Sequence, residues 1–497
     1  MDALYIHPAK QEVDARYDEY VASKTYPVIP VGAVGLANLL LAEGWSVRGL
    51  NLPLELLLRP TFSLRDWLAR QGRPRLVMVD LHWYEHSFGA LDVARAAKSV
   101  YPDVPVVIGG LTASRFAREI LQGFPEVDFV IRGDAEQPLR LLARALGDGP
   151  AAPAALARIP NLSFRQDSAV REAQRTYVAT TTDLDGLDFV GLDFLEHQAE
   201  YGGIQYSGVG LIDFKEVRWR GHWLSIGRGC VFNCCFCGGG RAAHRRLAGR
   251  ETVVLRSVER TADDIARLKA RGVHQVSLTL DPAALGREYW KPLFAALRSQ
   301  NLRIGLYNEC FQMPSDEFLR AFVEVADPAH TEVALSPLSG DESVRKLNGK
   351  GFSNARLLEV LATLREHRVP VFVYFSLNLP GETPQTFRQT LRLAERIGQQ
   401  YPGELLRMMN TCHTLDPVSP LSHSADRYGT RIEYKTFTDY YTYCRQTGWQ
   451  PRNVVRGSLR GYRFRSVGPG EVEGMARRWD AFAEAQSYRC FPVPRGW

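Results

Sequence analysis

Four of the chain's eight cysteines lie within eight consecutive positions, in a glycine-flanked stretch, residues 229–240, with the sequence GCVFNCCFCGGG. Cys230, Cys234 and Cys237 have the spacing C-x3-C-x2-C, so three thiolates on one loop can hold a cubane iron-sulfur cluster and leave its fourth iron without a protein ligand. Phe236 would shield one side of the cluster, and the glycines that follow let the backbone approach it closely. Such an open iron is a place for chemistry, and Cys235 is a spare thiol.

A zinc site, a disulfide pair and a chance group of buried thiols are three alternatives to an iron-sulfur loop. Structural zinc usually takes two C-x2-C pairs or added histidines at short spacing, and the sequence has no second pair. A disulfide framework is typical of small secreted domains, whereas this chain has 497 residues and no stretch typical of a signal peptide. The iron-sulfur loop is therefore the preferred interpretation.

The cysteine spacing, with an aromatic residue before the third cysteine, resembles the defining loop of the radical S-adenosylmethionine (SAM) superfamily. The resemblance implies that the three cysteines ligate a 4Fe-4S cluster and that the amino and carboxylate groups of SAM chelate the open iron. It also implies that the backbone of Gly238 and Gly239, beside Phe236, binds the SAM amino group. Reduction of the cluster would cleave SAM to methionine and a 5'-deoxyadenosyl radical.

Length and composition place the chain among ordinary globular proteins. With 497 residues, of which 45% are hydrophobic and 23% charged, it is long enough for two or three domains. No uninterrupted apolar run approaches the length of a membrane span, so we expect no membrane contact and a cytoplasmic location. The net charge of +6 comes without a block of Lys and Arg, so no nucleic-acid partner is expected.

Residues 1–149 alternate short apolar runs with helical patterns, which predicts a parallel, doubly wound α/β domain of the Rossmann type. Ligands of such domains bind beyond the carboxyl ends of the strands, and Gly109 and Gly110 lie at one of these ends. The predicted strands span residues 3–7, 46–50, 76–81, 104–108 and 129–132, and the predicted helices span residues 32–43, 87–100 and 113–123.

This pattern, with the turns at residues 30–32 and 109–113, resembles the cobalamin (B12)-binding domain that is fused to many radical SAM enzymes. The chain has no D-x-H-x-x-G histidine motif in the usual place. Residues 80–87, DLHWYEHS, put large side chains where small ones would make room for the nucleotide tail of the corrinoid. We therefore expect a relic of a cobalamin domain, or a domain that recognises substrate; bound cobalamin is possible but less favoured than its absence.

Residues 150–221 have little periodicity and are expected to form a linker and wrapping segment. Over residues 222–410 the alternation resumes at the spacing of a partial TIM-type barrel, similar to the (β/α)6 core of the radical SAM family. Residues 411–497, rich in Tyr, Trp and Arg, are expected to form a C-terminal cap over the barrel or to pack against the first domain. The predicted barrel strands span residues 223–227, 275–280, 303–307, 332–335, 371–377 and 405–410.

Catalytic groups in such barrels project from the carboxyl ends of the strands. Glu309 follows a predicted strand, and burial there would raise its pKa toward the range that is useful for proton transfer. Its alternative role is a salt bridge to a neighbouring Arg. Asp281 and His413 are the other candidate catalytic residues, and the remaining polar residues at the predicted mouth are Asn308, Ser336, Ser339, Tyr374, Ser376, Asn378 and Asn410.

Two segments at the predicted barrel mouth resemble SAM-binding segments of the family. Ser336 and Ser339 belong to a Ser-Pro-Leu-Ser-Gly stretch that is similar to the fourth-strand segment contacting the SAM ribose and carboxylate. Asn378 begins N-L-P-G-E-T, which resembles the G-x-P-G-E-T turn after the fifth strand. Capping of a loop is the alternative role for each of these residues.

The resemblance implies an enzyme that takes one electron from a flavodoxin- or ferredoxin-type donor and abstracts hydrogen from a polar small molecule. With cobalamin absent, we expect radical dehydration or deoxygenation of an amino sugar or a similar natural-product intermediate, a lyase-type reaction resembling the radical SAM diol dehydratases of aminoglycoside biosynthesis. The alternatives are a cobalamin-dependent radical SAM methyltransferase and an iron-sulfur scaffold or electron carrier.

Overall fold

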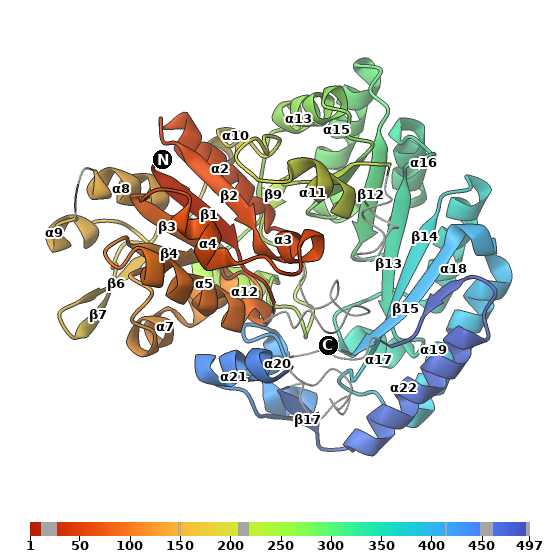
Figure 1. Ribbon diagram of the computed structural model, residues 1–497. Coiled ribbons are helices and arrows are strands. Elements are labelled where there is room, and N and C mark those ends of the chain that lie inside the picture. The colour runs from red at the N-terminus through yellow and green to blue at the C-terminus, as the bar shows by residue number, and fades with distance from the viewer. Residues whose placement is uncertain are drawn as a thin grey trace.

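Two α/β domains lie side by side in the computed structural model, each built on a seven-stranded sheet (Figure 1). The structure describes residues 1–10, 27–147, 149, 151–206, 218–412, 415–447 and 461–493. The predicted architecture, a Rossmann-like domain followed by a partial barrel of parallel strands, is confirmed. Candidate residue His413 lies outside the described residues. Among the described helices, none has both the length and the apolar character that crossing a membrane requires.

The first sheet has the strand order β2-β1-β3-β4-β5-β6-β7, and its first five strands are parallel. Alternate residues of these strands pack into apolar cores on both faces, as a parallel sheet between two helical layers requires. The chain turns from one side of β1 to the other between β2 and β3, so β1 and β3 flank the switch point where ligands of such sheets bind. The five strands are β1 (Ala3–His7), β2 (Val47–Asn51), β3 (Leu76–Asp80), β4 (Val106–Gly109) and β5 (Phe129–Ile131).

Helices cover both faces of this sheet. One core holds residues of α2 (Val31–Ala42) and α8 (Glu136–Leu146). The other core holds residues of α4 (Leu64–Ala69), α5 (Ser87–Val100) and α7 (Ala117–Gly123). The short helices of the domain are α3 (Leu52–Leu58), η2 (Tyr84–His86) and α6 (Leu111–Arg115).

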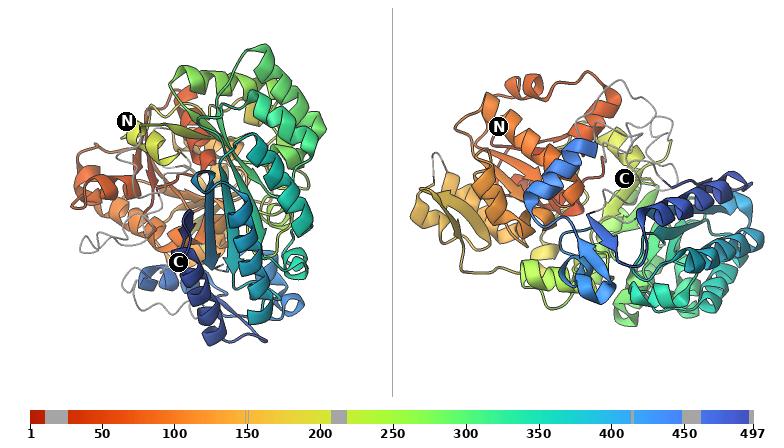
Figure 2. Two further views of the ribbon diagram at one scale, coloured as in Figure 1. Left: turned by 90° about the vertical axis from the view of Figure 1, so that its right-hand side faces the viewer. Right: turned by 90° about the horizontal axis from the view of Figure 1, so that it is seen from below.

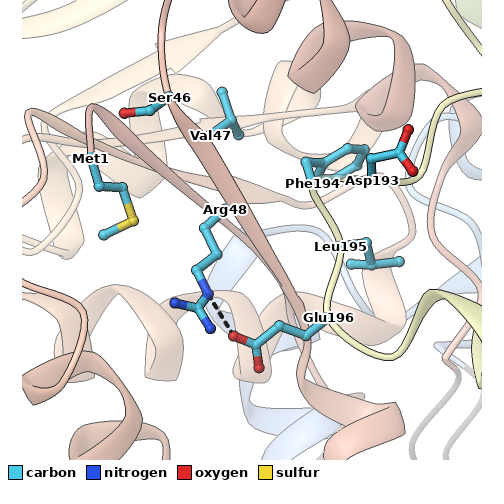
Figure 3. Close-up of a pocket in the computed structure, with 8 residues that line it drawn as sticks. All are labelled: Met1, Ser46, Val47, Arg48, Asp193, Phe194, Leu195 and Glu196. Carbon is cyan, nitrogen blue, oxygen red and sulfur yellow. Dashed lines mark hydrogen bonds and ion pairs between the residues drawn. The ribbon is translucent and has the colours of Figure 1, made fainter.

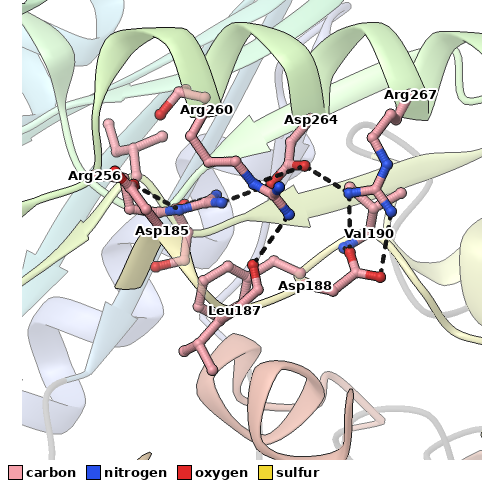
Figure 4. Close-up of polar contacts among 12 residues, drawn as sticks. Asp185, Leu187, Asp188, Val190, Arg256, Arg260, Asp264 and Arg267 are labelled. Carbon is pink, nitrogen blue, oxygen red and sulfur yellow. Dashed lines mark hydrogen bonds and ion pairs between the residues drawn. The ribbon is translucent and has the colours of Figure 1, made fainter. Parts of the chain in front are cut away.

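The segment predicted as a linker contributes structure to both domains. Its hairpin of β6 (Leu162–Gln166) and β7 (Ala169–Glu172) extends the first sheet antiparallel to β5. Farther along, it is tied to α13 (Val258–Ala270) of the second domain: Arg267 donates to Asp188 at 3.3 Å and to the buried Asp264 at 2.8 Å (Figure 4). Its helices are α9 (Pro153–Leu156), α10 (Thr181–Asp185) and α11 (Gln198–Ile204). The predicted domain boundaries stay predictions.

The second sheet is parallel throughout, in the order β18-β15-β14-β13-β12-β11-β8. Six of its strands correspond to the predicted ones. The seventh, β18, comes from the predicted cap and pairs with β15. The strands are β8 (Gly221–Leu224), β11 (Gln275–Leu278), β12 (Gly305–Cys310), β13 (Glu332–Leu338), β14 (Val371–Leu377), β15 (Leu406–Cys412) and β18 (Arg489–Phe491).

The helices between these strands pack on one face of the second sheet and enclose the largest apolar core. Ser257, Ser315 and Ser353 cap three of them by accepting a backbone N–H, which fixes where each helix begins. None of these helices therefore lies on the opposite face of the sheet. These helices are α13, α14 (Pro282–Leu285), α15 (Arg287–Ser299), α16 (Asp316–Val325), α18 (Asn354–Glu366), α19 (Pro384–Gln400) and α22 (Pro469–Glu484). The short helix α17 (Glu342–Leu347) instead packs Val344 against Leu338 and Leu379.

The C-terminal segment joins the two domains, as the view from below in Figure 2 shows. Helix α21 (Phe437–Thr447) packs its aromatic side chains onto α5 of the first domain, where Cys444 donates to the Tyr84 carbonyl at 3.3 Å. The pair of β16 (Thr430–Ile432) and β17 (Tyr462–Phe464) instead meets the second domain, because the Tyr462 hydroxyl donates to the Asn378 carbonyl at 2.7 Å. The segment thus packs against both domains, and its role as a cap over the barrel stays a prediction. Its short helices are α20 (Pro420–His423) and η4 (Ala425–Tyr428).

Candidate functional site

The cysteine loop lies between β9 (Gly227–Arg228) and α12 (Arg241–Ala248). Strand β9 pairs with β10 (Val254–Leu255), which closes the base of the loop. Within the loop the Cys237 N–H donates to the Cys234 carbonyl at 3.2 Å, and the Arg241 N–H donates to the Phe232 carbonyl at 2.8 Å. The loop is therefore a folded element rather than an extended connection.

The three predicted ligands are partly buried on this loop. Backbone N–H groups donate to two of their sulfurs, from Phe232 to Cys230 at 3.4 Å and from Gly239 to Cys237 at 3.3 Å. Such bonds stabilise cluster thiolates. Burial raises the pKa of Cys230 and Cys234 and raises that of Cys237 to about 12, so an apolar site without a metal keeps these thiols protonated.

The arrangement fits a cluster better than a single metal ion. Among the described residues, no three Cys, His, Asp or Glu side chains converge closely enough to hold one ion. A cubane places each thiolate on a different iron, so its ligands need not converge on one point. The three cysteines remain the proposed cluster ligands.

Cys235 is occupied elsewhere. Its side chain is buried, and its thiol donates to the amide oxygen of Asn348 at 2.8 Å. Its carbonyl accepts the N–H of Leu421 at 2.8 Å, which ties the loop to the C-terminal segment. The geometry thus supports the prediction that Cys235 is not a ligand.

Gly238 packs against Asp416, which follows β15. A Cβ on Gly238 would lie 1.9 Å from an Asp416 oxygen. The carboxylate accepts the N–H groups of Gly238 and, at 3.0 Å, Val418, and burial raises its pKa to about 7. Only glycine fits here, and Asp416 is a residue that the sequence did not point to. Phe236 packs against the apolar group of Leu338, Val344 and Leu379 at the ends of β13 and β14.

Gly238→Ala should weaken SAM binding about tenfold or more, because overpacking costs about 1–3 kcal/mol and the resemblance places the SAM amino group on this backbone. Anaerobic calorimetric titration with SAM measures the effect. Asp416→Ala in the same chain should restore part of the affinity by removing the clash. Gly351→Ala is the matched control, since no atom lies within 4 Å of its added Cβ. Unchanged affinity in Gly238→Ala would contradict the prediction.

A buried lysine that the sequence analysis missed lies next to the cysteine loop. Lys350 follows Gly349, whose Cβ position is 2.8 Å from the Cys234 Cα. Its ammonium donates to the Phe311 carbonyl at 2.7 Å, and its charge favours both the Cys234 thiolate and the Glu309 carboxylate. Burial lowers the pKa of Lys350. Its signal in the sequence is the isolated lysine between two glycines after the fourth barrel strand.

Glu309 lies on the face of the second sheet that turns away from the helices. Leu306 packs in the helix-covered core, and the alternation along β12 turns Tyr307 and Glu309 the other way. The Tyr307 hydroxyl donates to Glu309 at 3.1 Å and lies 3.4 Å from the Tyr374 hydroxyl on β14. Burial raises the pKa of Glu309, and no salt bridge joins it to a base within the described ranges. The structure therefore does not support the salt-bridge alternative.

Asp281 and Ser339 make the contacts of structural residues. The Asp281 carboxylate caps α14 through the Ala283 N–H at 3.0 Å and accepts the Phe311 N–H at 2.9 Å; burial raises its pKa to about 6. The buried Ser339 hydroxyl lies 3.3 Å from that of Thr390. Both residues remain candidates from the sequence. The polar atoms of their side chains already make hydrogen bonds within the protein.

Asn378 and Ser336 differ in how far they are engaged. Asn378 has a φ of 62°, the left-handed conformation that glycine adopts most easily, and its N–H donates to the buried Glu382 at 2.9 Å. Burial raises the pKa of Glu382 to about 8. The Ser336 hydroxyl is partly exposed and makes no hydrogen bond to the part of the chain that the structure describes. Ser336 is the more exposed of the two, whereas the Asn378 amide nitrogen is buried and likewise has no partner among the described residues.

Ion pairs attach the stem of the cysteine loop to the first domain. Arg228, in β9, pairs with Asp134 at 3.2 Å and with Glu136, and Arg250 pairs with Asp134. The Arg250 and Asp134 side chains are 3% and 4% exposed. Burial raises the pKa of Asp134, but Arg228 and Arg250 outweigh it and hold the pKa below its ordinary value. The cysteine loop is thereby held against the domain that carries the switch point.

Asp134→Asn should destabilise the protein by roughly 3–5 kcal/mol, because it leaves a buried arginine without its partner. Urea denaturation measures the loss. Glu473→Gln, which removes an exposed pair with Arg477, should change stability by less than about 0.5 kcal/mol. Since the folded pKa of Asp134 is lowered, its contribution is present above 3.8 and is lost as the pH falls through the lowered pKa. Equal effects of the two variants would contradict the prediction.

The switch point of the first sheet carries the residues that the sequence analysis judged too large for a corrinoid. Tyr84 and His86 are buried, Tyr84 against Tyr440 of α21 and His86 against His7. They therefore point into packed interiors, and only part of the bulky stretch remains at the strand ends. Gly110, with a φ of 119°, allows the turn after β4 to lie against the His82 backbone. The edge thus has a glycine turn beside the switch point, and two of the bulky side chains are turned away from it.

Two surface pockets lie away from this edge and from the cysteine loop. One, of about 400 Å³, is lined by residues of β2 and of the segment at 193–196, with the Arg48–Glu196 pair at its side (Figure 3). The other lies beside α13. Neither contains a residue of the candidate site.

Comparisons with known proteins match each domain separately. A family profile for the Radical SAM superfamily matches residues 224–394, and a profile for the B12 binding domain matches residues 19–143. The "Uncharacterized methyltransferase PH0819" of Pyrococcus horikoshii is 22% identical over 414 residues, covering 76% of this chain and 82% of that protein. The anaerobic magnesium-protoporphyrin IX monomethyl ester cyclase of Cereibacter sphaeroides is 22% identical over 310 residues, covering 61% of this chain and 47% of the cyclase.

Among solved structures, the fold is similar to that of the radical SAM methyltransferase TsrM from Kitasatospora setae, whose structure contains cobalamin and a 4Fe-4S cluster. The TM-score is 0.61 at 17% identity, with 87% of this chain and 81% of TsrM covered. At this identity the likeness concerns the fold.

These comparisons correct the expected reaction. Radical dehydration or deoxygenation by a lyase is wrong as the main expectation, because PH0819 and TsrM are both named methyltransferases. The B12 binding match also goes against the expectation that the first domain has lost its cofactor. The chain contains a radical SAM domain and, before it, a B12-binding domain.

Proposed function

We propose that the protein is a cobalamin-dependent radical SAM methyltransferase that acts on a small molecule. The observation that carries the proposal is that one chain holds both domains, with the stem of the cysteine loop attached to the B12-binding domain through Asp134. The names of PH0819 and TsrM support transfer of a methyl group over dehydration. An iron-sulfur scaffold or electron carrier would have no need of the B12-binding domain.

Cys230, Cys234 and Cys237 would hold the cluster, and the backbone of residues 238–240 would bind the amino group of SAM. The buried cation of Lys350, next to Cys234, suits the SAM carboxylate. The Ser336 hydroxyl, near the end of β13, makes no hydrogen bond to the described residues. The carboxyl ends of β1, β3 and β4 would receive the corrinoid. Bound together, these groups would supply a methyl carrier and a radical initiator.

The chain's own residues would orient the substrate and exclude water. Glu309, Tyr307 and Tyr374 form a hydrogen-bonded polar group on the face of the second sheet that turns away from the helices, suited to a polar or cationic substrate group. The C-terminal segment packs on the cysteine loop: the Leu421 N–H donates to the Cys235 carbonyl, and Leu421 and Tyr462 lie in one apolar cluster with Cys235. A flavodoxin- or ferredoxin-type protein would supply the electron, and the oxygen-sensitive cluster favours the cytoplasm.

Anaerobic reconstitution with iron, sulfide and hydroxocobalamin, followed by desalting, tests the proposal. The protein should retain about one corrinoid, and incubation with a reductant and SAM carrying a deuterated methyl group should give S-adenosylhomocysteine and label in small molecules of a cell extract. Protein reconstituted without hydroxocobalamin is the matched control and should release no S-adenosylhomocysteine. Loss of the corrinoid on desalting, together with formation of 5'-deoxyadenosine alone, would contradict the proposal.

A further inference from the structure

Two hydroxyl groups of β11 and its carboxyl end lie on the face of the second sheet that turns away from the helices. Val276 and Leu278 pack in the helix-covered core, so the alternation along the strand turns Ser277 the other way. Thr279 continues this alternation, because its N–H still donates to the Leu224 carbonyl of β8 at 3.1 Å. Both hydroxyl oxygens are buried, Ser277 is 1% exposed, and neither oxygen makes a hydrogen bond to a described residue. Because buried hydroxyls are nearly always hydrogen-bonded, these two indicate a surface that binds polar groups of a ligand.

The register of the sheet brings these hydroxyls together with Glu309. Ser277 is the partner of Tyr307 across β11 and β12, and the Tyr307 hydroxyl donates to Glu309 at 3.1 Å. Thr279 and Glu309 each lie two residues farther along their strands. From β14, the Tyr374 hydroxyl lies 3.4 Å from that of Tyr307. Polar side chains of three strands therefore meet on one face of the sheet.

Glu309 is the carboxylate of this group whose charge no base balances. Glu332 and Arg407, from β13 and β15 on the same face, pair with each other, with the Arg407 Nε 2.9 Å from the carboxylate. Arg489, beside Arg407 in β18, is exposed at the edge of the sheet. Lys350 donates to a backbone carbonyl at 2.7 Å next to the cysteine loop and makes no ion pair with Glu309. A partly buried carboxylate without a cation is costly, so a cationic ligand would be stabilised here.

Aromatic rings add to the preference for a cation. Trp223 packs edge-on against Tyr307, with ring centroids 5.9 Å apart, and Phe372 packs against Tyr374 at 4.1 Å. The faces of such rings attract ammonium groups. Trp223, Glu309, Phe372 and Tyr374 are all partly exposed, so a ligand can reach them.

We propose that the substrate carries a primary or secondary amine, protonated at neutral pH, which Glu309 binds, and that Ser277 and Thr279 bind polar groups next to this amine. The inference rests on the proposed function, because it names the substrate class of the same site. An ammonium group supplies the cation that Glu309 lacks, whereas a carboxylate or phosphate in its place would be repelled. The two hydroxyls can each donate or accept, so they suit a neighbouring hydroxyl or amide.

Three small probes of one shape test the charge preference: benzylammonium, benzyl alcohol and benzoate. Their binding is measured by saturation-transfer nuclear magnetic resonance on the full-length protein with its oxidised cluster and saturating SAM, which keeps benzoate away from Lys350. Benzylammonium should bind at least tenfold more tightly than benzoate, with the alcohol between them. Glu309→Gln should abolish this preference. Glu404→Gln, which removes an exposed acid paired with Arg368, is the matched control and should keep it.

Chemical modification of a cell extract tests the substrate itself. Acetylation of the amines in the extract should lower the transfer of label from methyl-deuterated SAM tenfold or more. Esterification of its carboxylic acids is the matched control and should leave the labelling in place. Ser277→Ala and Thr279→Val should each raise the amount of extract needed for half-maximal labelling roughly three- to tenfold, the scale of one lost hydrogen bond, with little change in the maximal rate.

The outcomes separate this inference from the proposed function. Benzylammonium binding no tighter than benzoate, a preference that survives Glu309→Gln, or labelling that survives acetylation would overturn the inference and leave methyl transfer unaffected. If the corrinoid is lost and no label forms, the proposed function fails, and the three probes still decide whether Glu309 binds an ammonium group. The probe comparison and the acetylation use wild-type protein, so they decide the question even if Glu309→Gln does not fold.

Discussion

Replacing any one of Cys230, Cys234 or Cys237 with alanine should abolish the absorbance and electron paramagnetic resonance signals of the cubane and the cleavage of SAM. A cubane held by three protein thiolates has none to spare, and the N–H groups of Phe232 and Gly239 already donate to the Cys230 and Cys237 sulfurs. Iron and sulfide content after anaerobic reconstitution, and 5'-deoxyadenosine formed with dithionite and SAM, measure the loss.

Cys235→Ala is the control for this experiment and should keep both the cluster and SAM cleavage. Its thiol donates to Asn348 in a buried contact, so the substitution removes one hydrogen bond and should cost about 0.5–1.5 kcal/mol of stability. Cys490→Ala tests a thiol outside the loop. A cluster that survives in Cys237→Ala and is lost in Cys235→Ala would reverse the ligand assignment.

The strands were predictable because each parallel sheet buries at least one face completely. Its strands therefore appear as apolar runs in the sequence. The missed strands show the limit of this signal. β7 is exposed along most of its length, and β18 has only three residues at an edge, so neither needs an apolar run. Pairing of β18 with β15 depends on α22. The buried Trp479 of this helix lies in the core, between the two strands and the other helices.

The candidate site was predictable where chemistry fixes a spacing and unpredictable where contacts come from distant segments. The cysteine spacing is local, so it is visible in the sequence. Asp416 and Lys350 come close to the loop only through the fold, since each follows a different strand. The bulky stretch after β3 led to a wrong expectation about cobalamin, because the sequence shows the size of its side chains but not the direction in which they point. Tyr84 turns toward α21, and His82 stays at the edge.

Glu309→Gln should leave cluster assembly and SAM binding intact while lowering the yield of methylated product by roughly 100-fold, the scale of a lost acid-base or charged hydrogen-bonding group. The carboxylate lies on the face of the sheet that turns away from the helices, Tyr307 donates to it, and it has no arginine partner among the described residues. Burial raises its pKa, so product formation should also fall as the pH drops through that raised value. Deuterated methyl transfer from SAM into a small-molecule extract measures the yield.

Tyr307→Phe tests the hydrogen bond to Glu309 while the Glu309 carboxylate stays in place. It removes the donor to Glu309 and keeps the ring against Trp223, so it should reduce product formation less than Glu309→Gln does. Glu404→Gln, which removes an exposed acid paired with Arg368, is the control and should leave the yield unchanged. If Glu309→Gln gives the wild-type yield and pH profile, Glu309 neither binds substrate nor transfers protons, and Lys350 becomes the charged residue to test on that side of the cysteine loop.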